Sequence, residues 1–593
     1  MNARMNLFAE LKRRNVLRAA ALYAGAVWAL AQGISQLAPV VNAPDWASRA
    51  FLIAAAIGFP FWIAFAWLYE FTAQGLKRES DIAADTTVTR SRGRKLDLAI
   101  IAVLAIAVVL LLTNQFVWRK GVLPENETVA VPDKSVAVLP FQNLSGDPQN
   151  GYFSDGVTEE IINALAQIPE LKVAGRNSAF RFRGGDNDAA KVGAALGVAT
   201  VLEGSVQKAG DEVRITTQLV NARDGYQLWS EKYDRKLTSI FAVEDEISKA
   251  IADKLRVQLG DTSRPLVKRR TTDPRAHDFY LRGTTLVAAR GPGLRDAAEA
   301  FQQAVAIDPG YAQAWAGLAQ AEALVANWHL DDKATAQARA LAAAQRALEL
   351  DANVAAAHMA RGIVYDDQWR WAEAGRELRR ALALAPGDAE VIDQHAQFLL
   401  ATGQLEPALR EIEHANRLDP LSGIIGSVHA EILLDLHRCD EASAQIAKAL
   451  AVAPDMLHTN GAALNIAVVC RRHAQAEVAA QRLASVANRD PKVLLALVRG
   501  VADPAARAQA VRLAETVPPQ SLNWGSEKAW WLALLGDKAA ALAALESQFG
   551  NGPAGGAERL WLPAFDPIRN DPRFKAVLKK IGLPYIPKDL DQS

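Results

Sequence analysis

The sequence contains few cysteines, carries no net charge and lacks familiar catalytic motifs. Only two of its 593 residues are cysteines, Cys439 and Cys470, which excludes a framework of several disulfides and a cysteine-rich metal site. One disulfide would need the two Cα atoms within ~7 Å, and the sequence leaves this open. Lysine plus arginine equals aspartate plus glutamate at 66 each, so the overall charge indicates no nucleic-acid partner.

Sequence signatures of common enzymes are absent as well. The chain has no GxSxG, HExxH or Walker sequence. Four of its nine histidines recur at nearly regular intervals: His358, His395, His429 and His458. A row of zinc ligands is one interpretation, but a repeated helical position explains the spacing more simply. We therefore expect no metal and no cofactor.

Long apolar stretches set the first 120 residues apart from the rest. They cover residues 19–41, 50–71 and 96–117. Each is long enough to cross ~30 Å of hydrocarbon as a helix, so the sequence predicts a membrane anchor of three transmembrane helices. The sequence "ALA" at Ala29–Ala31 resembles a small-residue cleavage site and offers an alternative, in which the first stretch is part of a cleaved signal peptide.

Basic residues predict the orientation of this anchor. They gather before the first stretch and in the loop 72–95, whereas residues 42–49 carry only Arg49. Because positive charge stays on the cytoplasmic side, the N-terminus and loop 72–95 are expected inside, and everything after Trp118 outside. The prediction is a multi-pass protein of a bacterial inner membrane, in contact with the lipid bilayer, with its C-terminal domains in the periplasm.

Residues 134–260 predict an α+β domain with the order βαβαβββα. It begins with Ser135–Ile161, "SVAVLPFQNLSGDPQNGYFSDGVTEEI", in which a strand leads through a loop into a helix capped by Ser154 or Asp155. The loop lacks the lysine of a phosphate-binding loop, and carboxylates crowd the helix start. Calcium binding is an alternative, but a capped helix entry accounts for these residues.

These residues, followed by "LGVATVLEGSVQKAGDEVRITTQLVNARDGYQLWSEKYDR", resemble the TolB N-terminal-like (FlgO-like) domain. The resemblance implies an extracytoplasmic interaction domain without a known catalytic centre. The apolar N-terminal stretches resemble those of bacterial membrane proteins that join this domain to tetratricopeptide (TPR) repeats. Some of those proteins carry a cyclase or a winged helix before the membrane segment, but only a short segment stands there in this chain. The resemblance therefore implies that the protein is not an enzyme.

Prolines mark a repeat in the second half of the chain. Pro386, Pro420 and Pro454 are equally spaced, and their interval matches the TPR period of about 34 residues. Small residues recur in register between them. After a linker at 261–277, the sequence predicts roughly seven helical hairpins over 278–550, with an insertion near Val325–Lys333. Residues 551–593 are expected to form a C-terminal cap and tail.

Stacked hairpins of this kind present a concave inner face that binds peptides or protein surfaces. Residues of each first helix at every third or fourth position are candidates for this face, although a solvated surface is the alternative for each. The candidates are Met359, Ile363, Asp366, Glu390, Asp393, Gln397, Ile424, Ser427 and Glu431.

The sequence thus predicts a membrane-anchored multidomain fold with three transmembrane helices, an α+β domain and an all-α TPR solenoid. The expected function is that of a non-enzymatic periplasmic scaffold for protein or peptide ligands in envelope assembly or sensing. The alternative is a signal-transducing receptor subunit, which couples periplasmic binding to a cytoplasmic partner at loop 72–95. An envelope hydrolase is a third and more distant interpretation.

Overall fold

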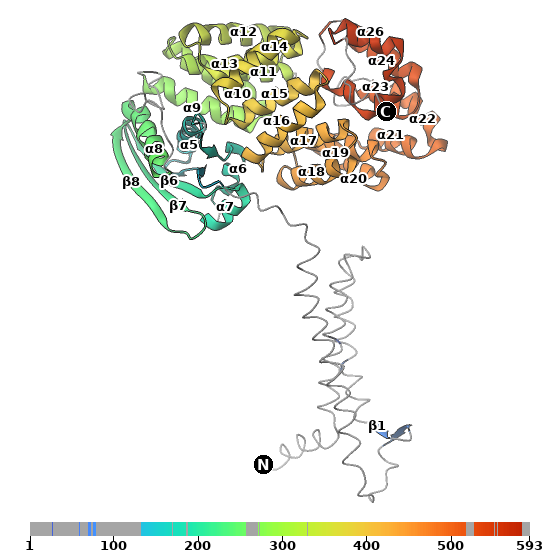
Figure 1. Ribbon diagram of the computed structural model, residues 1–593, viewed down its shortest axis with the longest axis horizontal. Coiled ribbons are helices and arrows are strands. Elements are labelled where there is room, and N and C mark those ends of the chain that lie inside the picture. The colour runs from blue at the N-terminus through green and yellow to red at the C-terminus, as the bar shows by residue number, and fades with distance from the viewer. Residues whose placement is uncertain are drawn as a thin grey trace, which may run out of the picture. The chain divides into compact units, whose positions relative to one another are not determined.

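The computed structural model in Figure 1 describes most of the chain after residue 131. The described residues are 132–583 without 169, 185–187, 256–270, 272, 329, 517–526, 551 and 554–555, together with 27, 59, 69–72 and 75–78. The chain divides into two units, Met1–Asn126 and Glu127–Ser593. Nearly all of the described residues belong to the second unit.

The predicted fold class needs correction. Within the described ranges, the structure has no helix whose length and apolar character suffice to cross a bilayer. The described chain is instead a predominantly helical, TPR-like solenoid that carries an α+β part. Apart from residues 27, 59 and 69–71, the predicted segments 19–41, 50–71 and 96–117 lie outside the described residues, as does most of loop 72–95.

The end of the second predicted segment can be checked directly. Tyr69–Thr72 forms strand β1, which pairs antiparallel with β2, Gly75–Arg78. The helix predicted to reach residue 71 is therefore wrong at this end. Aromatic residues and threonine favour a strand, and hydropathy alone did not register that preference.

A mixed β-sheet forms the centre of the α+β part. Its strands are β3 (Ser135–Val138), β4 (Gln142–Asn143), β5 (Lys172–Val173), β6 (Thr200–Ala209), β7 (Glu212–Asn221) and β8 (Gln227–Lys236). The strand order is β5-β3-β6-β7-β8, with β4 beside β6. Strand β3 runs parallel to both of its neighbours, and β6, β7 and β8 are antiparallel.

Helices cover both faces of this sheet. They are α5 (Gly151–Ala166), α6 (Arg176–Ala179), α7 (Ala189–Leu196) and α8 (Ile240–Lys254). Along β3, Val136 and Val138 join the large core that contains α5, α8 and the solenoid, while Ala137 and Leu139 join a smaller core beneath α7. The alternation follows from the two-residue period of a strand, and burial on both faces explains its apolar sequence.

Eight consecutive helix pairs follow within the described residues. They are α9 (Pro274–Ala289) with α10 (Leu294–Ile307), α11 (Ala312–Asn327) with α12 (Lys333–Leu350), α13 (Ala355–Asp367) with α14 (Trp371–Leu384), α15 (Ala389–Ala401) with α16 (Leu405–Leu418), α17 (Gly423–Asp435) with α18 (Cys439–Val452), α19 (Leu457–Val469) with α20 (His473–Val486), α21 (Lys492–Ala502) with α22 (Pro504–Thr516), and α23 (Glu527–Leu534) with α24 (Lys538–Gly550). The first helix, expected from residue 278, begins at Pro274.

The repeat period is visible in the backbone. Between the helices of four successive pairs, one residue has a positive φ: Trp369 (59°), Gly403 (73°), His437 (60°) and Arg471 (56°), each one full repeat after the last. Pro386, Pro420 and Pro454 each follow two residues after a second helix ends, where a missing amide proton does no harm. The extra residues near Val325–Lys333 do more than extend a loop. Helices α11 and α12 have 16 and 18 residues, against 13 and 14 in the next pair.

The C-terminal segment contacts the middle of the solenoid as well as its last pair. It consists of η8 (Ala557–Trp561), η9 (Pro563–Phe565), α25 (Asp566–Arg569) and α26 (Pro572–Lys580). The indole N–H of Trp561 donates to the Ala401 carbonyl at 3.2 Å, and that of Trp371 donates to the Ile581 carbonyl at 2.6 Å. A simple cap on the last repeat would make neither contact.

The two cysteines form a disulfide, a question that the sequence left open. Cys439 is the first residue of α18, and Cys470 follows the last residue of α19, with their Cα atoms 5.7 Å apart. The bond therefore joins two adjacent repeats.

The positive φ at Arg471 leads to a stability prediction. Arg471 is exposed, and a left-handed backbone favours glycine over any residue with a Cβ. Arg471→Gly should therefore raise the free energy of unfolding by about 0.5–1 kcal/mol, after allowing for the greater freedom of glycine in the unfolded chain. Thermal and urea unfolding would measure it. Gly403→Ala, at the equivalent turn, should lower stability, and a loss of stability in Arg471→Gly would contradict the prediction.

Candidate ligand-binding groove

The concave side of the solenoid encloses a large cavity of about 1470 Å³. Its walls come from the first helices of successive pairs, from α9 to α19. Helix α5, strand β5 and helix α6 close the opposite side, and η8 adds a further wall. Pockets for drug-sized ligands usually span about 300–1,000 Å³, so this space fits a larger ligand.

Eight of the nine residues that the sequence predicted for the inner face line this cavity. They are Met359, Ile363, Asp366, Glu390, Asp393, Gln397, Ile424 and Glu431. The exception is Ser427, which is fully buried and hydrogen-bonded to Gly423 and Thr459. Their role in binding stays a prediction, but the structure brings these eight to one surface.

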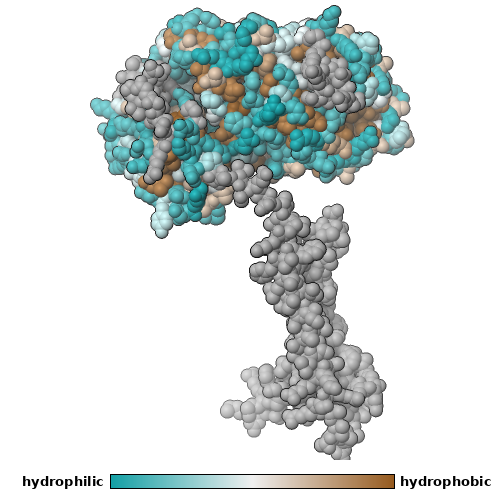
Figure 2. Space-filling model, viewed as in Figure 1, coloured by the Kyte–Doolittle hydropathy of each residue, from teal (hydrophilic) through white to brown (hydrophobic). Residues whose placement is uncertain are grey.

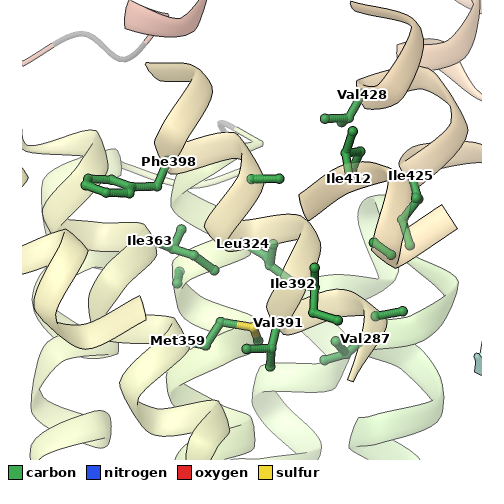
Figure 3. Packing of buried hydrophobic residues seen from close by; sticks show 14 of the residues in the cluster. Val287, Leu324, Met359, Ile363, Val391, Ile392, Phe398, Ile412, Ile425 and Val428 are labelled. Carbon is green, nitrogen blue, oxygen red and sulfur yellow. The ribbon is translucent and has the colours of Figure 1, made fainter. Parts of the chain in front are cut away.

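The first helices also share a packed apolar core behind and beside the cavity. Figure 3 shows Leu324 of α11, Ile363 of α13 and Val391 of α15 gathered in this core. On the face drawn in Figure 2, hydrophobic residues gather in the middle of the solenoid, with hydrophilic residues around them. The residues that line the cavity are likewise both apolar and polar.

One contact that closes the cavity lies between α5 and α9, which Figure 1 shows next to each other. The Tyr280 hydroxyl donates to Glu160 at 2.9 Å, and the Tyr152 hydroxyl donates to Asp278 at 2.6 Å. The helices approach at Gly156, where a Cβ would lie 2.6 Å from the Leu281 side chain. Glycine is needed at this position because any side chain would push the helices apart.

The carboxylates of the loop and helix after β3 have defined structural partners. Helix α5 begins at Gly151, so the predicted cap at Ser154 or Asp155 is wrong by about one turn; Asp147 instead caps the short turn before α5. Asp155 pairs with Arg183 at 2.6 Å, and Glu159 with Arg176 at 2.7 Å. These carboxylates hold α5 and the α6 segment together.

A second closing contact joins the α6 segment to the turn between α16 and α17. Asp419, 2% exposed, accepts hydrogen bonds from the Ser178 amide (2.7 Å), the Asn177 side chain (2.9 Å) and the Ser178 hydroxyl. The Gly175 amide donates to the Leu418 carbonyl at 2.6 Å, and the Leu421 amide donates to the Ser178 hydroxyl at 2.7 Å. We call this set of bonds the Asp419 latch.

Glycines permit the close approach at this second contact too. A Cβ on Gly175 would lie 2.5 Å from the Asp419 side chain, and one on Gly387 would lie 2.8 Å from the Ala166 carbonyl oxygen. Neither distance is tolerable for a real side chain. The cavity is therefore closed by backbone-to-backbone contact beside the fourth helix pair.

Negative charge predominates on the cavity lining, with eleven carboxylates against five lysines and arginines. Some carboxylates have partners: Arg290 pairs with Glu390, Lys333 lies 2.8 Å from Asp367, and His458 lies 3.1 Å from Glu431. Among the described residues, no ion pair involves Asp366, Asp393 or Asp435. These three carboxylates make the cavity an acidic one.

Burial shapes the ionisation of these groups. It raises the pKa of Asp393 to about 7 and that of Asp388 to about 6, and the neighbouring Glu390 adds to both. It raises the pKa of Asp366 and Asp435 well above the ordinary value. Burial also opposes charge on His458 and Glu431, yet their mutual contact raises the pKa of His458 and lowers that of Glu431.

The other recurring histidines occupy separate places. His358 bonds to Glu377 at 2.6 Å, and His395 lies 3.7 Å from Glu411. Burial lowers the pKa of His429 to about 4. Of these and His458, only His458 lines the cavity. Within the part of the chain that the structure describes, no three histidine, cysteine or acidic side chains are grouped to hold a metal ion.

Sequence reasoning missed two important residues. Asp435 lies one helical turn beyond Glu431 on α17, so extending the predicted inward stripe by one turn would have found it. Asp419 had no such signal, because its partners belong to the α+β part, far earlier in the chain.

Part of the chain is similar to a known protein, although no family model matches. A protein named putative adenylate cyclase 3, from Rhizobium meliloti (strain 1021), is 43% identical over 187 residues, which cover 31% of this chain and 32% of that protein. The chain thus matches about a third of the length of this curated relative.

This likeness contradicts the expectation that the protein has no enzymatic character, because the relative is named as an enzyme. The expectation came from missing catalytic motifs and from the resemblance to a domain without a known catalytic centre. Neither observation tests whether part of the chain is shared with an enzyme.

Solved structures with similar parts include TPR proteins. A thermophilic TPR protein of Thermus thermophilus, TTC0263, is 22% identical and covers 31% of this chain and 95% of its own, with a TM-score of 0.27. PilF of Pseudomonas aeruginosa is 18% identical and covers 36% of this chain and 91% of its own, with a TM-score of 0.28. The TPR fold of residues 274–550 follows from the helix pairs and their regular period in this chain.

The Asp419 latch gives a local stability prediction. Asp419→Ala leaves the buried Ser178 amide without an acceptor, which should cost about 2–4 kcal/mol of local stability. Hydrogen exchange of α6 should become faster, with α21–α24 unchanged. Asp440→Ala is the control, since the Asp440 side chain is 99% exposed. Unchanged exchange of α6 in Asp419→Ala would contradict a closing role for this contact.

The raised pKa of Asp393 gives a pH prediction. The folded chain keeps the Asp393 proton up to about pH 7, whereas the unfolded chain loses it near its ordinary pKa of 3.8. The free energy of unfolding should therefore fall as the pH rises from about 4 through 7. Between pH 5 and 8, this fall should be smaller by about 2 kcal/mol in Asp393→Asn than in the parent. Urea unfolding across this range would measure it. Because the pKa of Asp388 is also raised, both the parent and Asp393→Asn should keep some dependence of stability on pH. The control variant Asp253→Asn, at an exposed residue, should behave like the parent.

Proposed function

We propose that the protein is an interaction scaffold whose concave groove binds a segment of a partner protein. The observation that carries this proposal is the cavity of about 1470 Å³, lined by the first helices of successive TPR pairs. Arrays of this kind bind peptides on that face because successive repeats present a continuous, rigid surface. The eight predicted inner-face residues at this cavity support the same interpretation.

Access to the groove depends on the α+β part in this proposal. Contacts at α5–α9 and at the Asp419 latch hold α5 and α6 across the concave side. A segment enters either through the remaining openings or after the latch parts. The α+β part thus serves as a cover as well as a platform.

We place this function outside the cytoplasm, in the bacterial envelope, in assembly or sensing. The disulfide between Cys439 and Cys470 supports this, because such bonds persist mainly in oxidising compartments. The resemblance of residues 134–260 to TolB N-terminal-like domains supports it as well.

A second candidate function follows from the relative named as an adenylate cyclase. The shared third of that protein would then be a regulatory part, and this chain would affect cyclic nucleotide synthesis through a partner. In that case, loss of the chain changes the cellular level of cyclic AMP, whereas a scaffold without this link leaves it unchanged.

Photo-crosslinking in intact cells tests the proposed function. Gln394 lines the cavity and Gln345 is exposed on α12, so both can be replaced by p-benzoylphenylalanine in the full-length chain. We expect a defined adduct with an envelope protein from position 394 and none from position 345. The same adducts from both positions, or only cytoplasmic proteins from position 394, would refute the proposal.

A further inference from the structure

Two buried carboxylates at the cavity have oxygen atoms without a hydrogen-bond donor. Asp393 is 3% exposed and Asp435 is 2% exposed, and the Oδ1 atom of each lacks a partner among the described residues. The Oδ1 atom of Asp366, on α13, also lacks a hydrogen-bond partner among the described residues. An unpaired buried carboxylate is costly to a fold. Each of these atoms therefore marks a place where a donor from outside the described chain would be stabilising.

The nearby cationic side chains are already engaged. Arg290 pairs with Glu390, and Lys333 pairs with Asp367. Arg569 is buried near Asp435, but its N–H groups donate to Asp566 and to the carbonyls of residues 560–562. Arg559, which also lines the cavity, lies 3.7 Å from Glu558. The cavity therefore keeps an excess of acidic side chains over lysines and arginines.

The unpaired carboxylates belong to one connected strip of charge. Glu558 of η8 interacts electrostatically with both Asp366 and Asp435. His458 of α19 contacts Glu431 at 3.1 Å and interacts electrostatically with Asp393. The strip thus crosses α13, α15, α17 and α19, in the direction along which an extended ligand would run.

We infer that the groove selects an extended polypeptide segment that carries lysine or arginine side chains, whose cationic groups are received by Asp393 and Asp435. This inference rests on the proposed function and names the chemistry of the partner. An ammonium or guanidinium group supplies the missing donors, and its charge stabilises the ionised form of each carboxyl group, which burial alone disfavours. The apolar side chains of Met359, Ile363 and Ile424 lie on the same surface and contact the uncharged residues of the segment.

The same surface provides for the backbone of such a segment. The Nη1 atom of Arg290 lacks an acceptor, and Arg290 lines the cavity near Asp393. In the inferred complex, we assign to this atom a hydrogen bond to a peptide carbonyl of the segment. A cavity of about 1470 Å³ with spaced acidic and apolar positions suits a peptide better than a single small cation.

Binding of such a segment is linked to pH. The charged groups that act on Asp393 are Glu390 on its own helix, Arg290 of α9 and His458 of α19, and Gln397 donates to its Oδ2 atom at 2.8 Å. A cation favours the ionised carboxylate, so binding releases the proton that burial retains near neutral pH. Affinity should therefore rise between pH 6 and pH 8, the opposite of what a histidine-driven contact with an acidic segment would give.

A random twelve-residue peptide library, displayed on phage, tests the inference against the immobilised full-length chain. We expect selection to enrich lysine and arginine over the unselected library. Enrichment of peptides without any basic preference would overturn the inference and leave the proposed function standing. A library without enriched peptides would overturn both.

Variants then assign the preference to the cavity. Asp393→Asn/Asp435→Asn should weaken the selected peptides at least tenfold at pH 7.5, measured by fluorescence anisotropy. The control Asp253→Asn/Glu299→Gln removes two exposed carboxylates on α8 and α10, and it should bind as the parent does. Equal weakening by both double variants would mean that general charge attraction, and not the cavity, holds the peptide. The single Asp393→Asn variant repeats the test if the double variant does not fold.

Discussion

Close packing at three glycines, where no side chain fits, is the constraint on which the groove depends. Gly156 lets α5 lie against α9, and Gly175 and Gly387 let the same part of the chain touch the solenoid again beside its fourth helix pair. The Asp419 latch then fixes the second contact with hydrogen bonds. With both contacts in place, a surface that is open in a bare solenoid becomes a partly covered groove.

Enclosure accounts for the unusual ionisation of the lining. Carboxylates on an open concave face would be solvated, and their pKa values would stay near the ordinary range. Behind α5, α6 and η8 the same groups lose their contact with water. Burial then becomes the largest influence on the pKa values of Asp366, Asp393 and Asp435, and it raises all three. A fold gains nothing from such groups by itself. Their presence is reasonable where stability is given up for recognition.

The sequence reveals features that repeat along the chain better than contacts between residues that are far apart in it. The spacing of Pro386, Pro420 and Pro454 predicted the solenoid, and counting by helical turns placed Met359, Asp393 and Glu431 on its inner face, because both follow from periodicity. The turn residues Trp369, His437 and Arg471 escaped notice, since a positive φ is expected at glycine and, of the four equivalent turns, only the one at Gly403 has a glycine. The Asp419 latch could not be predicted, because a single carboxylate bonded to residues far earlier in the chain leaves no periodic trace. The apolar character of residues 50–71 predicted a helix up to residue 71, but Tyr69–Thr72 forms a strand, as its aromatic residues and threonine favour.

Because of the disulfide, adjacent repeats do not all rotate against each other with the same ease. Stacked repeats contact only their neighbours, so an array of this kind can stretch and coil by small rotations summed over every junction. Cys439 and Cys470 bind the α17–α18 pair covalently to the α19–α20 pair, and that one junction can no longer slide or rotate freely. Bending must then concentrate in the junctions on either side, and the repeats that contribute Glu431 and His458 move as one piece. Under reducing conditions the bending would spread evenly, and the distance between these two side chains would begin to fluctuate.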